Sequence, residues 1–137
     1  MDSAVTPSMT AADLLAKARA RYERVTPAQA LAEQRRGALL VDTRSADAIR
    51  ADGLVPGAHR VSLSTLPWRV DPAGPWSDAA LADRDARLIV LSQDGYSSSL
   101  AVEWLLDLGF ARATDMEGGV TAWIEAGLPI ERSEDPG

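Results

Sequence analysis

Apolar and polar residues follow one another in short blocks along this chain, each about as long as one helix or strand. Residues 38–42 (ALLVD) and 88–91 (LIVL) form two nearly continuous apolar runs, as expected of strands covered on both faces of a parallel sheet. In residues 97–108 apolar residues recur every three or four positions, which is typical of a helix packed on a sheet. Because strands alternate with helices, the sequence predicts an α/β fold with an open parallel sheet and helices on both faces.

Before the first apolar run, the chain is expected to form two helices. Thr10 can cap an amphipathic helix that reaches Val25, and Thr26 followed by Pro27 is a start signal for a second, shorter helix. We therefore divide the chain into an N-terminal tail with an amphipathic helix (1–25) and a main domain (26–137).

The tryptophans suggest one loop and two core positions. Residues 64–78 contain three prolines and two tryptophans, Trp68 and Trp76, which predicts a loop with rigid corners and no regular structure. Trp104 and Trp123 fall on apolar helix faces and are expected in the core.

The composition excludes several kinds of chemistry. The 137 residues include no cysteine and one histidine, His59, so disulfides, thiol nucleophiles and zinc clusters are not expected, nor any other metal or cofactor. The net charge of −6, without a basic stripe, argues against nucleic acid as a partner. No apolar run could span a bilayer and the start lacks a secretory pattern, so a cytoplasmic protein without membrane contact is expected.

The residues after the second apolar run are the best candidates for a binding site. In open α/β sheets, ligands bind beyond the carboxyl ends of the strands, and Gly95 permits a turn with positive φ there. The N–H groups of this turn can converge at the positive end of the following helix and attract an anion, although Asp94 opposes a highly charged one. The simpler alternative is a serine-rich helix cap. The predicted site comprises Ser92, Gln93, Asp94, Gly95, Tyr96, Ser97 and Ser98.

Three longer segments resemble one known family. They are LLVDTRSADAIRADGLVPGAHRV, RLIVLSQDGYSSSLAVEWLLDLGF and ATDMEGGVTAWIEAGLPI, and together they resemble the rhodanese, or sulfurtransferase, domain family over residues 26–131. The shared marks are V-D-T-R at a strand end, P-G-A after a turn, a strand-loop-helix with a central glycine, and G-G-x-x-A-W-x-x-A-G-L-P. The resemblance implies a rhodanese-like fold and transfer of a sulfane sulfur from thiosulfate or a persulfide to an acceptor thiol.

The resemblance places Ser92 where the family has its nucleophilic cysteine. A serine hydroxyl is far less acidic than a thiol and cannot form a persulfide. No other cysteine exists to replace it, so the chain as written is predicted not to transfer sulfur. Many members have an arginine at the position of Ser97. The six-residue loop from Ser92 to Ser97 is the sulfur-using form, because related phosphatases use a loop one residue longer, and this disfavours phosphatase activity.

Three interpretations of Ser92 stay open. The first is a natural loss of the nucleophile, which leaves a non-catalytic module that binds a protein partner or a small anion. The second is a laboratory replacement of the cysteine in a parent thiosulfate or persulfide sulfurtransferase. The third is a serine nucleophile for hydrolysis, which is disfavoured because it needs a base within reach, and in the family the position of His59 lies away from the loop.

Further side chains complete the predicted site. Asp42 and Arg44 match the family's strand-end pair, with Arg44 expected to pair with Asp47 and to support the loop, and a purely structural ion pair is the alternative for both. Arg69 could reach across the mouth of the loop as an anion contact, or it could be a solvated loop arginine. The tryptophans at 68 and 76 either wall the pocket or pin their own loop to the surface.

Overall fold

A four-stranded parallel sheet forms the centre of the molecule. The computed structural model describes residues 8–132. All neighbouring strands are parallel, so their carboxyl ends meet at one edge of the sheet, and the predicted open parallel α/β sheet is confirmed. The order is β2-β1-β3-β4, with β1 (Leu39–Asp42), β2 (His59–Arg60), β3 (Leu88–Leu91) and β4 (Thr114–Asp115).

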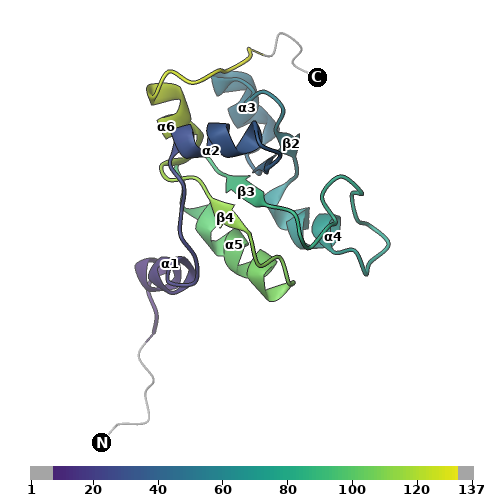
Figure 1. The fold of residues 1–137 in the computed structure, drawn as a ribbon. Coiled ribbons are helices and arrows are strands. Elements are labelled where there is room, and N and C mark those ends of the chain that lie inside the picture. The colour runs from purple at the N-terminus through teal and green to yellow at the C-terminus, as the bar shows by residue number, and fades with distance from the viewer. Residues whose placement is uncertain (1–7, 133–137) are drawn as a thin grey trace, which may run out of the picture.

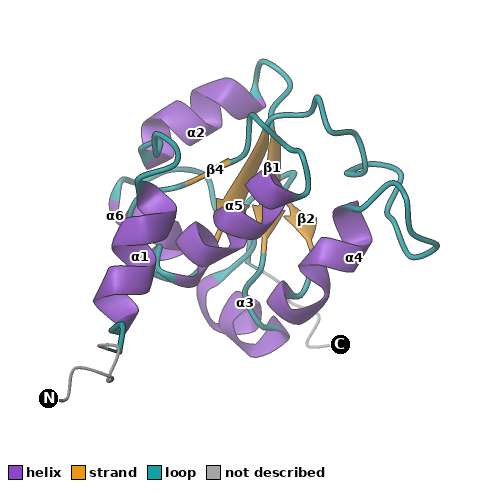
Figure 2. Cartoon of the chain, turned by 90° about the horizontal axis from the view of Figure 1, so that it is seen from below, coloured by secondary structure: helices purple, strands orange, loops and turns teal. Residues whose placement is uncertain are grey.

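Helices cover both faces of this sheet (Figure 1). One face packs against α2 and α6, the other against α4 and α5, and α1 lies outside against α5, as Figure 2 also shows. Within residues 8–132, no helix combines the length and apolarity needed to cross a membrane. The helices are α1 (Ala11–Arg19), α2 (Pro27–Gln34), α3 (Ala46–Asp52), the 3-10 turn η1 (Leu63–Thr65), α4 (Leu66–Val70), α5 (Ser97–Asp107) and α6 (Gly119–Glu125).

The two central strands send successive side chains to opposite cores. Leu40 and Ile89 pack with α2 and α6, whereas Val41 and Val90 pack with α4 and α5. All four residues of β3 are fully buried. A strand covered on both faces has no polar side, which explains the continuous apolar runs.

The N-terminal helix is shorter than predicted. Thr10 caps it as expected, in a capping box with Asp13, but the helix ends at Arg19 and does not reach Val25. Val25 instead forms a parallel bridge with Met116, next to β4. Tyr22 packs against the core formed with α4 and α5, whereas Val25 belongs to the core formed with α2 and α6, so the apolar spacing does not mark one helix face.

Two further expectations are corrected. The segment 64–78 is not wholly irregular, because it begins with η1 and α4, and Pro67 lies in the first turn of α4, where proline is tolerated. Trp104 is 39% exposed and lies outside the core, whereas Trp123 is fully buried as predicted.

Close packing between α6 and the segment after β3 requires Gly119, the second residue of the Gly118-Gly119 pair. Gly119 has φ +63°, and a Cβ there would lie 2.5 Å from the carbonyl oxygens of Ser92 and Gln93. These carbonyls accept hydrogen bonds from the amides of Val120 and Thr121 at 2.9 and 3.0 Å. The start of α6 is thereby attached directly to the backbone of the loop.

Gly119→Ala is expected to destabilise the fold by at least about 2 kcal/mol, because backbone strain at positive φ adds to a steric clash with two carbonyl oxygens. Urea denaturation followed by circular dichroism measures the loss. Gly74→Ala is the matched control, since a Cβ there meets only ordinary contacts, 3.7 Å or more away, and φ is not positive. Equal stability of the two variants would contradict this account of the glycine pair.

Candidate functional site: the loop after the third strand

The loop 92–98 joins the end of β3 to the start of α5 at the carboxyl edge of the sheet. Gly95 turns the chain with φ +85°, and no side chain fits there, because a Cβ would lie 2.8 Å from the amide nitrogen of Gly118. Ser92 and Ser98 are buried, whereas Asp94 and Tyr96 are exposed. The loop therefore has an inner side of serines and an outer side open to solvent.

The hydroxyl of Ser92 lies inside the loop. Its Oγ accepts a hydrogen bond from the amide of Gly95 at 3.1 Å and donates to Ser98 Oγ at 3.0 Å. Ser98 in turn donates to the Asp115 carboxylate at 2.8 Å. A chain of hydrogen bonds thus connects the first residue after β3 to the last residue of β4.

Asp115 is the centre of a larger buried network. Its side chain is fully buried, and it also accepts hydrogen bonds from Ser99 Oγ at 2.7 Å, Tyr22 Oη at 2.9 Å and Arg24 Nε at 2.9 Å. A buried carboxylate needs such partners to offset its lost hydration. The network holds the start of α5 against β4.

Two arginines of the N-terminal segment support the loop from outside. Arg19 Nη2 and Arg24 Nη2 both donate to the carbonyl oxygen of Gly95, at 2.7 and 2.9 Å. Arg19 Nε also donates to Ser99 Oγ at 2.9 Å. Because this carbonyl is held by the arginines and those of residues 92 and 93 are held by α6, the loop is fixed through its carbonyl groups.

Apart from the Gly95 amide, which donates to Ser92 Oγ, the amide groups of residues 93–98 are left free by this arrangement. Within residues 8–132 no acceptor is found for the backbone N–H groups of residues 93, 94, 96, 97 and 98. They precede or open α5, an 11-residue helix whose N-terminus carries partial positive charge. Such a set of amides can bind an anion or stabilise a negatively charged group on the side chain at position 92.

Two polar side chains of the loop are tied to neighbouring helices. Gln93 Nε2 donates to Asp52 at 2.9 Å and to Thr121 at 3.1 Å, and Thr121 Oγ1 donates to the Asp94 carboxylate at 2.7 Å. These contacts draw the Asp94 charge toward α6. They anchor the loop to α3 and α6.

Comparisons with known proteins support a family assignment. A model described as the rhodanese-like domain matches residues 26–126. This chain belongs to the rhodanese-like domain family.

Sulfurtransferases are among the relatives of this rhodanese-like domain. The thiosulfate sulfurtransferase GlpE of Stutzerimonas stutzeri is 31% identical over 102 residues, which cover 74% of this chain and 84% of that protein. A sulfurtransferase of Allochromatium vinosum is 29% identical over 96 residues, which cover 70% of this chain and 80% of that protein.

Solved structures share the fold. A protein of unknown function from Rhodopseudomonas palustris, described as a possible tyrosine phosphatase, has a TM-score of 0.83 and 29% identity, covering 93% of this chain and 98% of its own. A rhodanese-related protein from Thermoplasma volcanium has a TM-score of 0.65 and 26% identity, covering 82% of this chain and 100% of its own.

The strand-end arginine of this rhodanese-like domain has a different partner from the one predicted. Arg44 donates to the Asp42 carboxylate from Nε at 3.1 Å and from Nη2 at 2.8 Å, whereas Asp47 pairs with Arg50. The side chains of Asp42 and Arg44 are each 1% exposed, and a buried charge is paired by its nearest opposite charge. Asp47 is exposed on α3, one turn from Arg50.

The Asp42–Arg44 pair joins two elements of the fold. Arg44 Nη2 also donates to the carbonyl oxygen of Gly53, which ends α3, at 2.9 Å. The pair thus ties the end of β1 to the end of α3. This geometry matches the structural interpretation of the pair.

Arg69 lies in α4 and contacts the segment that follows this helix. Its Nη1 donates to the carbonyl oxygen of Trp76 at 2.9 Å, and its Nη2 lies 3.9 Å from the Asp78 carboxylate. Trp68 and Trp76 are 60% and 66% exposed. A role for Arg69 as an anion contact stays a prediction.

The contacts of Ser92 do not support a role for it as the nucleophile of a hydrolase. Its Oγ bonds the Gly95 amide and another hydroxyl, neither of which is a base. His59 lies on β2, and β1 separates that strand from β3. A nucleophilic serine requires a base within hydrogen-bond reach, and within residues 8–132 none bonds this hydroxyl directly.

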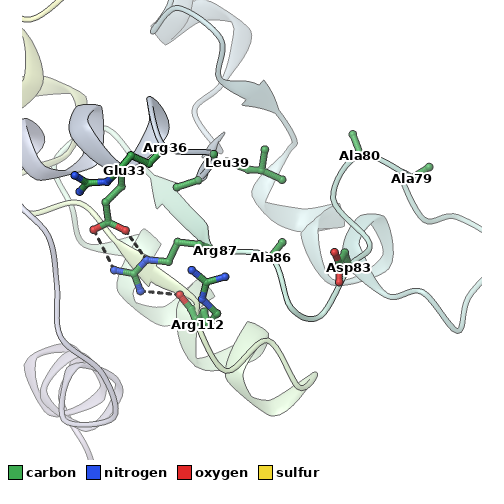
Figure 3. A pocket seen from close by; sticks show the side chains of 11 residues that line it. Glu33, Arg36, Leu39, Ala79, Ala80, Asp83, Ala86, Arg87 and Arg112 are labelled. Atoms are coloured by element: carbon green, nitrogen blue, oxygen red, sulfur yellow. Dashed lines mark hydrogen bonds and ion pairs between the residues drawn. The ribbon is translucent and has the colours of Figure 1, made fainter.

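A hollow of about 530 Å³ opens at the opposite edge of the sheet, where the strands begin (Figure 3). Its central side chain, Arg87, donates to both carboxylate oxygens of Glu33, at 2.8 and 3.3 Å, and to the carbonyl oxygen of Arg112 at 2.7 Å. The Arg87 hydrogen bonds hold the pKa of Glu33 below its ordinary value. These contacts describe a structural ion pair at the edge away from the loop.

Five residues of the site were missed by the sequence analysis: Arg19, Tyr22, Arg24, Ser99 and Asp115. Three of them lie in the segment that was treated as a separate flank. The structure gives the reason to single out Asp115, since it is a fully buried carboxylate at the end of β4 and acidic residues are rarely buried without partners.

Asp115→Asn is expected to destabilise the protein by about 3 kcal/mol, because it leaves the largely buried Arg24 without its counter-charge. Chemical denaturation measures the effect. Asp107→Asn is the control, since Asp107 is 66% exposed and pairs with Arg21 at the surface, where such pairs contribute at most about 1 kcal/mol. If the two variants lose the same small amount, Asp115 does not hold the loop.

The environment of the Tyr22 hydroxyl predicts that the stability of the fold changes with pH in the alkaline range. Burial, together with the nearby Asp115 carboxylate, raises the pKa of the Tyr22 hydroxyl above its ordinary value of 10.0. The unfolded chain therefore loses this proton first, so the stabilisation is complete below about pH 10 and declines above it. In urea denaturation at pH 9 and 11, Tyr22→Phe is expected to lose less stability than the unchanged protein. Equal losses would contradict the raised pKa.

Proposed function

We propose that this rhodanese-like domain binds a small sulfur-containing anion or persulfide group on the amides of the loop 92–98. In this proposal Ser92 occupies the position of the family's nucleophilic cysteine, so the chain as written does not transfer sulfur. A form with cysteine at this position would be a thiosulfate or persulfide sulfurtransferase that passes sulfur to an acceptor thiol.

The observation that carries the proposal is the environment of the Ser92 side chain. Ser92 is the first residue after β3 and is 4% exposed. Its Oγ accepts a hydrogen bond from the Gly95 amide. A thiolate at the same place would be stabilised by that amide and by the partial positive charge at the start of α5. Sulfur transfer also needs an S–S bond, which an oxygen nucleophile cannot form.

A non-catalytic role is the second candidate. The loop is held without a cysteine, by hydrogen bonds from Arg19, Arg24 and the start of α6. Its free amides would bind a small anion whether or not a reaction follows. Such a domain would act as a binding or regulatory module for an anion or a protein partner.

Phosphatase activity is not part of the proposal, although the relative from Rhodopseudomonas palustris is described as a possible tyrosine phosphatase. The loop from Ser92 to Ser97 has six residues, and the family resemblance associates this length with sulfur. A covalent mechanism would also require an activated nucleophile, which the contacts of Ser92 do not supply.

Ser92→Cys tests the proposal in the thiosulfate:cyanide assay. The new thiolate attacks the outer sulfur of thiosulfate, the S–S bond of thiosulfate breaks, and sulfite leaves with the electron pair. Cyanide then removes the sulfur from the cysteine persulfide as thiocyanate and regenerates the thiolate. Thiocyanate is expected from the Ser92→Cys protein and not from the unchanged chain.

Ser92→Ala is the matched control, because it removes the hydroxyl without adding a thiol and should stay inactive. Circular dichroism and thermal unfolding establish that all three proteins are folded. Turnover by the unchanged chain would overturn the predicted inactivity. A folded but inactive Ser92→Cys protein would argue against sulfur transfer and leave the binding module as the candidate.

A further inference from the structure

Arg24 contacts both the loop 92–98 and the buried carboxylate of Asp115. Its Nε donates to Asp115 Oδ1 at 2.9 Å, and its Nη2 donates to Asp115 Oδ2 at 3.1 Å and to the carbonyl oxygen of Gly95 at 2.9 Å. The side chain of Arg24 is 16% exposed and that of Asp115 is 0% exposed, so salt and water screen this pair only weakly. One guanidinium thus joins the last residue of β4 to the centre of the loop.

The Asp115 carboxylate lies close to position 92. Ser92 Oγ donates to Ser98 Oγ at 3.0 Å, and Ser98 Oγ donates to Asp115 at 2.8 Å, so a single hydroxyl separates the two side chains. A thiolate nucleophile carries a negative charge, and a second negative charge so near would oppose its ionisation. A nucleophile at position 92 therefore requires that the charge of Asp115 be compensated.

The remaining charged groups near position 92 do not supply this compensation. Three of them are carboxylates, and the pair after β1 is neutral as a whole. Arg19 is cationic, but its hydrogen bonds go to the Gly95 carbonyl and to Ser99 Oγ. These remaining groups are Asp52 on α3, Asp94 in the loop, Glu117 before α6, Asp42 with Arg44 after β1, and Arg19 on α1.

We propose that Arg24 is a positioning residue for the chemistry at position 92, because it neutralises Asp115 and so allows the nucleophile there to carry a negative charge. It acts through the carboxylate, to which two of its three hydrogen bonds go. Arg24 precedes residue 26, where the match to the family begins, so this support comes from the N-terminal segment. The inference rests on the proposed function for the nucleophile, and it adds a residue on which the ionisation of that nucleophile depends.

The ionisation of the thiol that Ser92→Cys introduces tests the inference. The chain has no cysteine of its own, so the ultraviolet absorbance of the thiolate, followed over pH, gives the pKa of this one group. The same variants with Ser92 retained serve as blanks for tyrosine. Adding Arg24→Gln is expected to raise the pKa of the thiol, so that the thiolate fraction at a pH below that pKa falls at least about tenfold.

Asp115→Asn provides the opposite half of the test. It removes the negative charge and leaves Arg24 in place, so in the Ser92→Cys protein it is expected to lower the pKa of the thiol and to increase the thiolate fraction. A merely structural role of the Arg24–Asp115 pair would move the pKa in the same direction in both variants, since either change loosens the loop. Shifts of the same sign would therefore overturn the inference.

Arg21→Gln is the matched control. Arg21 also belongs to the N-terminal segment, but it pairs with Glu103 and Asp107 of α5. The pKa of the thiol is expected to stay the same in this variant. A loss of thiolate as large as that in Arg24→Gln would contradict a specific role for Arg24.

Circular dichroism establishes which variants fold, and a double variant keeps the test decisive if a single one does not. Arg24→Gln combined with Asp115→Asn removes both charges of the pair, and Arg19 still holds the Gly95 carbonyl. The thiolate fraction of this protein is expected to stay within about threefold of that of Ser92→Cys alone, because the two charge effects oppose each other. A loss of about tenfold or more in the double variant would overturn the inference.

The thiol pKa is measured without turnover, so the inference and the proposed function can fail separately. Opposite shifts of the pKa without thiocyanate formation would support the role of Arg24 and argue against sulfur transfer. Thiocyanate formation by a protein whose thiol pKa does not depend on Arg24 would overturn the inference and leave the proposed function in place.

Discussion

The buried carboxylate of Asp115 is the contact on which the arrangement of the loop depends. It accepts hydrogen bonds from Ser98 and Ser99 at the start of α5, and from Tyr22 and Arg24 in the segment that follows α1. A buried charge is tolerated only with a full set of partners. The four donors must therefore be in place together. The end of β4 thereby fixes the loop, α5 and the N-terminal segment relative to one another.

The N-terminal segment is physically part of the site, although the family model begins at residue 26. Arg19 and Arg24 lie before that point, and both donate to the Gly95 carbonyl at the centre of the loop. Their two positive charges lie close to the turn in a chain whose net charge is −6. They favour a negative charge at the loop.

Much of the fold could be predicted, because strand and helix patterns are local. The apolar runs located β1 and β3, and Thr10, Thr26 and Gly95 located two helix starts and a turn. Contacts between distant segments leave no such local pattern. The pairing of Arg44 with Asp42 and the convergence of four donors on Asp115 depend on which charges are buried together, and spacing alone does not determine that.

The chain of hydrogen bonds from residue 92 to Asp115 also explains why a serine fits at position 92. Ser92 donates to Ser98, and Ser98 donates to Asp115, so all the hydroxyl protons point toward the carboxylate. A thiolate at position 92 has no proton to donate, so the Ser98 hydroxyl would have to turn toward it. Asp115 would then keep Tyr22, Arg24 and Ser99 as donors. The network can therefore accept a negative charge at position 92 by reversing one hydroxyl, without exposing the buried carboxylate.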